Sequence, residues 1–307
     1  MKIVFAGSPE YAVPSLAALI DSGKEVVAVI TQPDRPVGRK RVLTPTPVKA
    51  YAISRGIPVY DFEKVRLHAD RVKAIGADIM ITCAYGQLLS QEILDCFPKG
   101  VWNLHASLLP EFRGASPIQS AILAGKTHTG VTVMKTELSL DTGDILLVKR
   151  CEIGGKTCGE LSEVLSALSA EAAAEAVNLL ETGEENLLIQ DEAKATYCKK
   201  IIKSDARIDF SVDAEKAVNL INAMSPAPAA FCYLNGEPIN VYKAELADGD
   251  YGGAIGEVVA ADRKNGIIVK CADGAVSLSS VQFQGGKPQS AADAVNGRKI
   301  KAGDVLD

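Results

Sequence analysis

The sequence has few of the residues on which metal and redox chemistry depend. Its 307 residues include only three histidines, His68, His105 and His128, and none has a cysteine or histidine partner at metal-ligand spacing. The seven cysteines are scattered and form no Cys-x-x-Cys pair, which argues against both a redox motif and a disulfide framework. We therefore expect no bound metal, and reduced thiols that serve mostly as small core residues.

Long apolar runs and an export signal are also missing. No run approaches the roughly 18 apolar residues that indicate a membrane-spanning helix. The opening residues, MKIVFAGSPE, fit a buried strand that ends in a Gly-Ser-Pro turn, not a secretory leader. This turn also lacks the G-x-G-x-x-G pattern of dinucleotide sites. These absences predict a cytoplasmic protein without a membrane-spanning segment.

The charge is weakly acidic, with 33 Lys+Arg against 38 Asp+Glu and a net charge of -5. Proteins that coat nucleic acid are strongly basic, so this balance argues against that class but not against a small basic patch. Hydrophobic residues at 47% and charged residues at 23% are ordinary for a globular protein with a substantial core.

The first 150 residues alternate short apolar strands with helix-like stretches. Nearly continuous apolar strands between helices are typical of a doubly wound (Rossmann-like), mostly parallel sheet that is covered on both faces. Such a sheet binds ligands beyond the carboxyl ends of its strands. The expected elements are strands at 2–6, 25–31, 78–83 and 100–105, and helices at 11–22, 48–56 and 64–75.

The pattern of expected secondary structure changes near residue 205. A helix at 213–224 precedes short strands that are separated by turn pairs such as Asn235-Gly236. Several short strands with frequent turns predict a small, OB-like β-barrel, so the fold class is α/β with a C-terminal barrel domain. The predicted parts are a catalytic domain at 1–186, a surface linker at 187–204 and the barrel at 205–307.

Two polar side chains lie near the carboxyl end of the strand expected at 100–105. The period of two residues puts Asn103 and His105 on one side of that strand. An imidazole suits proton transfer near neutral pH, and an amide N–H can hold a developing oxyanion. A hydrogen-bonded, non-catalytic histidine at a strand end is an equally good interpretation of the pair alone.

Two further segments are ambiguous when each is taken alone. Leu108 and Leu109 lie in a long loop, where they either plug the core or form an apolar wall for a flat ligand. Asp141, in Asp141-Thr142-Gly143, either belongs to a simple turn or points inward beside a histidine. In the second case its carboxylate would orient the imidazole, as in catalytic dyads.

A basic loop follows the strand expected at 25–31. From Arg35 to Lys49 there are five basic residues and no acidic one, and prolines flank the basic tip. A flexible basic tip on stiff stems suits contact with phosphates, although a solvated loop explains the same composition.

In combination, these motifs resemble the folate-dependent formyltransferases. The spacing of Asn103-x-His105, Ser107-Leu108-Leu109-Pro110, Arg113-Gly114 and Asp141 is similar to that of the family. Residues 31–49 resemble the loop of those members that act on charged initiator tRNA. Further matches are Ala84-Tyr85-Gly86, Gln190-Asp191-Glu192 and Ala206-Arg207-Ile208-Asp209, so the resemblance covers essentially the whole chain.

The resemblance implies transfer of a formyl group from 10-formyltetrahydrofolate to the α-amine of methionine on initiator tRNA. It implies that Asn103 and protonated His105 stabilise the oxyanion, while Asp141 moves protons and holds His105. It also implies that the barrel binds tRNA and that the enzyme acts as a monomer without metal. The folate-binding residues by this resemblance are Ser107, Leu108, Leu109 and Pro110, and the tRNA-binding residues are Arg35, Arg39, Lys40 and Arg41.

Two departures and three alternatives accompany this interpretation. Relatives often carry a basic residue where this chain has Glu111, and usually have Asn-Pro-Trp-Pro or similar where this chain has Ser225-Pro226-Ala227-Pro228 after the helix at 213–224. Residues 205–307 also contain 10 Lys+Arg against 14 Asp+Glu. The same core also serves formyltransferases of amino-sugar nucleotides. With water as the acceptor, it would hydrolyse 10-formyltetrahydrofolate and release formate. A tRNA-binding module without catalysis is the third alternative, and Asn103, His105 and Asp141 argue against it.

Overall fold

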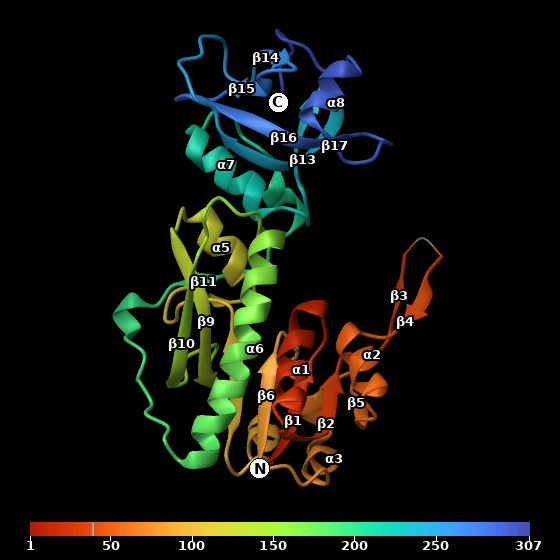
Figure 1. The fold of residues 1–307 in the computed structure, drawn as a ribbon, viewed down its shortest axis with the longest axis vertical. Helices are drawn as coiled ribbons and strands as arrows, with labels where there is room; N and C mark the ends of the chain where they lie inside the picture. Colours follow the sequence, from red (N-terminus) through yellow and green to blue (C-terminus); the bar gives the residue numbers. More distant parts are fainter. Residues whose placement is uncertain (39) are drawn as a thin grey trace. The chain divides into compact units, whose positions relative to one another are not determined.

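The computed structural model describes residues 1–38 and 40–307, and Arg39 lies outside the described residues (Figure 1). The chain divides into two compact units. The first unit comprises Met1–Gly114, Thr129–Cys151 and Ser162–Cys198, and the second comprises Ala115–His128, Glu152–Leu161 and Lys199–Asp307. The predicted domain limits at 186, 187–204 and 205 stay a prediction.

The first unit is built around a sheet with the strand order β10-β9-β7-β6-β1-β2-β5. Strands β5, β2, β1, β6 and β7 run parallel, and β9 is antiparallel to β7. This confirms the doubly wound, mostly parallel fold class. The strands are β1 (Lys2–Gly7), β2 (Glu25–Thr31), β5 (Val59–Asp61), β6 (Ile79–Cys83), β7 (Val101–His105), β9 (His128–Lys135) and β10 (Ile145–Glu152).

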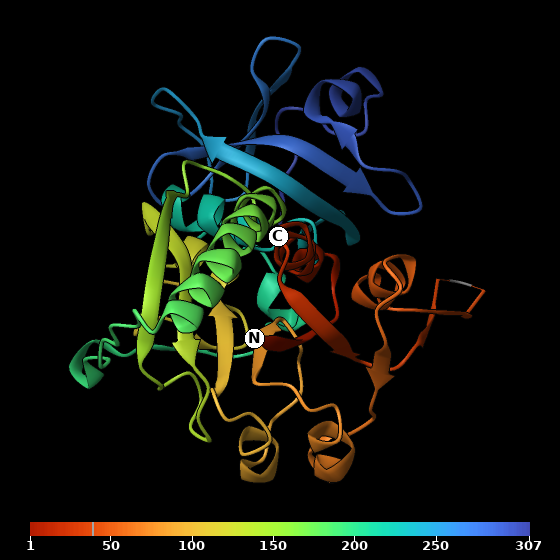
Figure 2. The ribbon, with the colours of Figure 1, turned by 60° about the horizontal axis from the view of Figure 1, so that its bottom comes forward.

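Helices cover both faces of this sheet (Figure 2). Val72 of α3 and Ile93 of α4 pack on one face with Val4 and Met80. On the other face α1 lies beside α6, and the hydroxyl of Tyr11, just before α1, is 2.9 Å from that of Ser169 in α6. The helices are α1 (Val13–Asp21), α2 (Pro47–Ser54), α3 (Ala69–Lys73), α4 (Gln91–Leu94) and α6 (Cys158–Thr182), which extends into the second unit.

The helix predicted at 64–75 is shorter in the structure. A 3-10 turn η2 (Val65–Leu67) is separated from α3 by His68, whose φ of -132° is not helical. The His68 ring stacks on Phe62 with centroids 4.9 Å apart, and the Gln87 side chain accepts a hydrogen bond from the amide of Val65 at 2.8 Å. These tertiary contacts override the helical periodicity of the segment.

The second unit contains an antiparallel sheet with the strand order β12-β13-β16-β15-β14. Beyond the edge strands, Leu306 bridges Leu234 of β12, and Val305 bridges Glu257 beside β14. The last residues thereby join the two edges, which closes the sheet and confirms the small barrel. Its strands are β12 (Ala230–Leu234), β13 (Glu237–Leu246), β14 (Val258–Asp262), β15 (Gly266–Lys270), β16 (Ala275–Phe283) and β17 (Gln289–Ser290), which pairs with β16.

Local chemistry explains how this barrel is held. Asn235 and Gly236 have φ values of 53° and 80°, which is the type I′ turn that an Asn-Gly pair favours between hairpin strands. Asn222 of α7 (Ala214–Ala223) is 3% exposed, and its side-chain amide exchanges hydrogen bonds with the main chain of Ala244 at 3.0 and 3.1 Å. A helix α8 (Ala291–Asn296) packs on β15 and β16.

Neither a membrane-spanning helix nor a metal cluster is found among the described residues. No helix in residues 1–38 and 40–307 is long and apolar enough to cross a membrane. Within the same residues, no group of three or more His, Cys, Asp and Glu side chains is arranged to hold a metal ion. The short elements are β3 (Arg35–Val37), β4 (Val42–Thr44), β8 (Arg113–Gly114), β11 (Tyr197–Cys198), α5 (Pro117–Leu123), η1 (Glu10–Ala12), η3 (Glu192–Lys194) and η4 (Lys203–Ala206).

Candidate active site

The polar residues of β7 face the carboxyl edge of the parallel sheet. The hydroxyl of Thr82, on neighbouring β6, donates a hydrogen bond of 2.7 Å to Oδ1 of Asn103. Because Oδ1 accepts this bond, the Nδ2 group of Asn103 is the end that donates. Asn103 thus presents an N–H donor on the face of β7 that it shares with His105.

His105 has a defined proton on one ring nitrogen. Its side chain is 6% exposed, and Nε2 lies 2.9 Å from the carbonyl oxygen of Phe112. A carbonyl oxygen only accepts, so Nε2 carries a proton and donates it there. Nδ1 faces the other way, 3.7 Å from Oδ2 of Asp141. The nitrogen that faces the carboxylate is therefore Nδ1.

Asp141 reaches His105 from the loop between β9 and β10. Its φ is 54°, in the left-handed region that non-glycine residues rarely adopt. Its Oδ2 accepts a hydrogen bond of 2.8 Å from the amide of Gly114. The structure thus brings Asp141 and His105 together as a pair, with Asn103 two residues before His105 on the same strand.

The four residues Ser107, Leu108, Leu109 and Pro110 form a tightly held loop. Ser107 is fully buried and donates its hydroxyl proton to the Glu111 carbonyl at 2.6 Å. Leu109 is 7% exposed and packs in a core cluster with Met134 and Ile145. Leu108 and Pro110 are half-buried and keep surface for a ligand. Their role in folate binding stays a prediction.

The basic loop forms a hairpin of β3 and β4. It follows β2, so it starts at the same edge of the parallel sheet as His105. Arg35, Lys40 and Arg41 are exposed on it. The predicted contact residue Arg39 lies outside the described residues.

Lys49 differs from the other basic residues of this segment. Its ammonium group donates to Asp34 at 2.8 Å and to Asp61 at 2.7 Å. These two carboxylates raise the pKa of Lys49 above its ordinary value. Lys49 therefore holds the base of the hairpin, and its charge is neutralised by the two aspartates.

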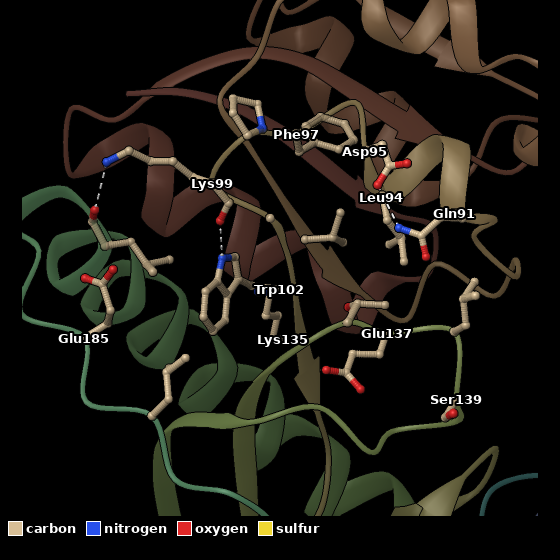
Figure 3. Close-up of a pocket in the computed structure, with 17 residues that line it drawn as sticks. Gln91, Leu94, Asp95, Phe97, Lys99, Trp102, Lys135, Glu137, Ser139 and Glu185 are labelled. Atoms are coloured by element: carbon tan, nitrogen blue, oxygen red, sulfur yellow. Dashed lines mark hydrogen bonds between the residues drawn. The ribbon is translucent and has the colours of Figure 1, made fainter.

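A pocket of about 930 Å³ lies beside the loop that carries Asp141 (Figure 3). Leu94, Phe97, Val101 and Leu138 are among its apolar lining residues. Thr136 also lines it, and the hydroxyl of this residue is buried without a hydrogen-bond partner among the described residues.

One wall of this pocket is fixed by main-chain contacts. The indole of Trp102 donates to the Lys99 carbonyl at 3.0 Å, and the Lys99 ammonium donates to the Leu180 carbonyl at 3.2 Å (Figure 3). These bonds tie the start of β7 to the end of α6. The pocket therefore has a preformed wall on that side, as is usual for sites that bind flat ligands.

The comparisons with known proteins agree with this geometry. A family profile described as "Formyl transferase" matches residues 1–177, and one described as "Formyl transferase, C-terminal domain" matches residues 200–299. A methionyl-tRNA formyltransferase of Sulfurihydrogenibium sp. is 40% identical over 311 residues, with 100% of both chains covered. The chain belongs to the family of methionyl-tRNA formyltransferases.

Two more comparisons describe the extent of the likeness. The methionyl-tRNA formyltransferase of Ectopseudomonas mendocina is 44% identical over 302 residues, with 97% of this chain and 95% of that protein covered. A solved N-formyltransferase of Helicobacter canadensis, in complex with folinic acid and dTDP-3-aminofucose, has a TM-score of 0.70. The two sequences are 17% identical, and the match covers 92% of this chain and 99% of that chain. At this identity the likeness shows only the fold.

The sequence did not predict the burial of two polar residues of this formyltransferase, Gln190 and Arg113. Gln190 was expected in a surface linker, yet it is 6% exposed and contacts the Asp141 loop. Arg113 was expected only as part of a motif, yet its side chain is fully buried. The signal was present in the resemblance of Gln190-Asp191-Glu192 and Arg113-Gly114 to the family.

Proposed function

We propose that this chain transfers the formyl group of 10-formyltetrahydrofolate to the α-amine of methionine esterified to initiator tRNA. The product is formylmethionyl-tRNA for translation initiation. The observation that carries the proposal is the His105–Asp141 pair beside Asn103, in a chain whose relatives of this name match it from end to end. We further propose that it acts in the cytoplasm as a monomer and needs no metal.

The chemistry of the transfer follows from the donors at the site. The amine lone pair attacks the formyl carbon, whose oxygen gains negative charge as the carbon becomes tetrahedral. Nδ2 of Asn103 and protonated Nδ1 of His105 donate hydrogen bonds to that oxyanion. The amine loses a proton to Asp141, directly or through water. The bond from carbon to N10 then breaks, N10 takes up a proton, and tetrahydrofolate leaves.

We place the pterin ring of the folate in the pocket beside the Asp141 loop. Its apolar walls suit the faces of a flat ring. Leu108 and Pro110 would then contact the part of the folate nearer to the transferred group.

Filling this pocket is expected to weaken folate binding. Leu94→Trp adds an indole to the lining, so we expect the Kd for tetrahydrofolate to rise roughly 10-fold, while the KM for tRNA stays unchanged. Isothermal titration with tetrahydrofolate measures the change. Leu67→Trp is the control, because Leu67 is 70% exposed outside the pocket. An unchanged Kd in folded Leu94→Trp protein would show that the pterin does not bind in this pocket.

We propose that the hairpin of β3 and β4 grips the acceptor end of the tRNA. Arg35, Lys40 and Arg41 offer exposed cations for phosphates. From the sequence alone, we include Arg39 among the proposed contact residues. Val37 and Leu43 are 57% and 65% exposed on the same hairpin. The exposed apolar side chains suit contact with base faces, and the cations suit the backbone.

Removing charge from the hairpin is expected to affect tRNA and not folate. For Lys40→Gln combined with Arg41→Gln, we expect the KM for tRNA to rise roughly 10-fold. We also expect the slope of log KM against log salt concentration to decrease by about 1 for each phosphate contact that is lost. Initial rates at several salt concentrations measure both. The matched control is Lys64→Gln with Arg66→Gln, an exposed pair elsewhere with the same change in charge. Equal effects of the two double variants would contradict the hairpin assignment.

We propose that the catalytic domain spans 1–186, that 187–204 connects it, and that the barrel at 205–307 binds tRNA outside the reaction site. The guanidinium of Arg207 lies 5.7 Å from the ring centre of Tyr233 on β12, and Tyr233 packs edge-on against Phe231 of the same strand. A cation backed by aromatic rings suits RNA despite the acidic balance of the barrel.

The direct test supplies the purified protein with 10-formyltetrahydrofolate and one acceptor at a time. We expect folate release with charged initiator methionyl-tRNA, and none with an amino-sugar nucleotide or without acceptor. Turnover on the sugar nucleotide would instead support the first alternative. Turnover without any acceptor would indicate a hydrolase.

A further inference from the structure

A polar cluster of buried Arg113 and Gln190 with exposed Glu192 and Tyr197 adjoins the Asp141 loop. The Arg113 side chain is fully buried, and its N–H groups all donate. Nε and Nη2 bond Oε1 of Gln190 at 3.1 and 2.8 Å, and Nη1 and Nη2 bond the Glu192 carboxylate at 2.9 and 2.6 Å. Nη1 also bonds the Tyr197 hydroxyl at 3.2 Å. The guanidinium is thereby fixed on all its polar edges.

Gln190 connects this cluster to the Asp141 loop. Its Nε2 group donates to the carbonyl oxygens of Asp141 at 2.9 Å and of Gly143 at 2.7 Å. A flipped amide would point its N–H groups at the guanidinium of Arg113, which only donates. Arg113 therefore decides which end of the Gln190 amide faces the loop.

The loop needs such support because of the conformation of Asp141. With φ at 54°, its backbone persists in a sparsely populated region only where neighbours hold it. Gly114 fixes the carboxylate and Gln190 fixes the main chain of the same residue. Together they keep Oδ2 of Asp141 at 3.7 Å from Nδ1 of His105.

We propose that Gln190, oriented by Arg113, is a positioning residue for the reaction, which acts by holding Asp141 against His105. This inference rests on the roles proposed for that pair. Gln190 contacts the main chain of Asp141 and Gly143, so it acts on turnover through Asp141 and leaves tRNA binding unchanged.

Gln190→Glu tests this role at constant shape. The carboxylate still accepts from Arg113 but has no protons for the carbonyls of Asp141 and Gly143, so the loop is released. We expect kcat to fall roughly 10-fold with an unchanged KM for tRNA. Hydrogen exchange of the amides at 139–143 is expected to speed up. If Gln190→Glu does not fold, Gln190→Met removes the same two donors without adding charge and carries the same expectations.

Asn222→Asp is the matched control, since Asn222 is a buried amide whose Nδ2 also donates to a main-chain carbonyl, but in the barrel. It should lower thermal stability while the exchange at 139–143 and kcat of the folded protein stay as before. Unchanged exchange at 139–143 in Gln190→Glu would overturn the proposal.

A double-mutant cycle separates positioning from general stability. If Gln190 acts through Asp141, the Gln190→Glu change has no further effect on single-turnover rates in Asp141→Ala protein. A full 10-fold effect in that background would also overturn the proposal. The exchange measurement needs no substrate, so it decides the Gln190 contact even if the proposed formyl transfer fails with every acceptor.

Discussion

Replacing Asn103 by alanine is expected to lower kcat about 10²–10³-fold, which is the usual effect of losing one donor to an oxyanion. The side chain donates through Nδ2 only while Oδ1 stays bonded to Thr82. The loss should fall on kcat, because the amide acts on charge that develops in the transition state. Single-turnover rates with saturating folate and charged tRNA measure it.

The companion variant Thr82→Val tests whether the orientation of Asn103 matters. It removes the hydroxyl that bonds Oδ1 but keeps the amide itself, so we expect a smaller loss, roughly 10-fold. Near-normal turnover of folded Asn103→Ala protein would refute the oxyanion role. Equal losses in the two variants would mean that the Asn103 amide contributes only when Thr82 orients it.

Gly143→Ala is expected to lower kcat about 10²-fold, because it displaces the loop that carries Asp141. A Cβ atom at this position would lie 1.9 Å from the carbonyl oxygen of Lys135, so the backbone must move. The Gly143 carbonyl that Gln190 holds moves with it. Overpacking of this kind also destabilises proteins by about 1–3 kcal/mol.

Thermal unfolding and steady-state rates together measure this second effect. Gly252→Ala is the control, because a Cβ atom at Gly252 would meet nothing within 4 Å. We expect that variant to keep both its stability and its turnover. If Gly143→Ala protein kept full activity, the Asp141 loop would tolerate displacement and its positioning would not matter.

The parts of the fold that local patterns encode were predictable. The strands expected at 2–6, 25–31, 78–83 and 100–105 correspond to β1, β2, β6 and β7. Each is an apolar run between helices, and burial on both faces requires little else. The period of two residues likewise placed Asn103 and His105 on one face of β7.

The supporting residues were not predictable, since their burial depends on distant partners. Gln190 lies in a polar segment that resembles a linker, and it is buried because Arg113, 77 residues away, bonds it. Lys49 was counted with the basic loop, but Asp34 and Asp61 bind its ammonium group. Composition gives the charge of such side chains, and only the tertiary structure gives their partners.

The joining of the barrel edges by Val305 and Leu306 has a consequence for synthesis of the chain. The ribosome makes the amino-terminal sheet long before these residues, and domains generally fold in that order. Until residue 306 emerges, β12 and β14 remain open edges that can pair with other chains. Closure also brings together residues far apart in the sequence, which slows folding. Ribosomes that stall short of residue 305 are therefore expected to carry chains with a formed sheet and an association-prone barrel.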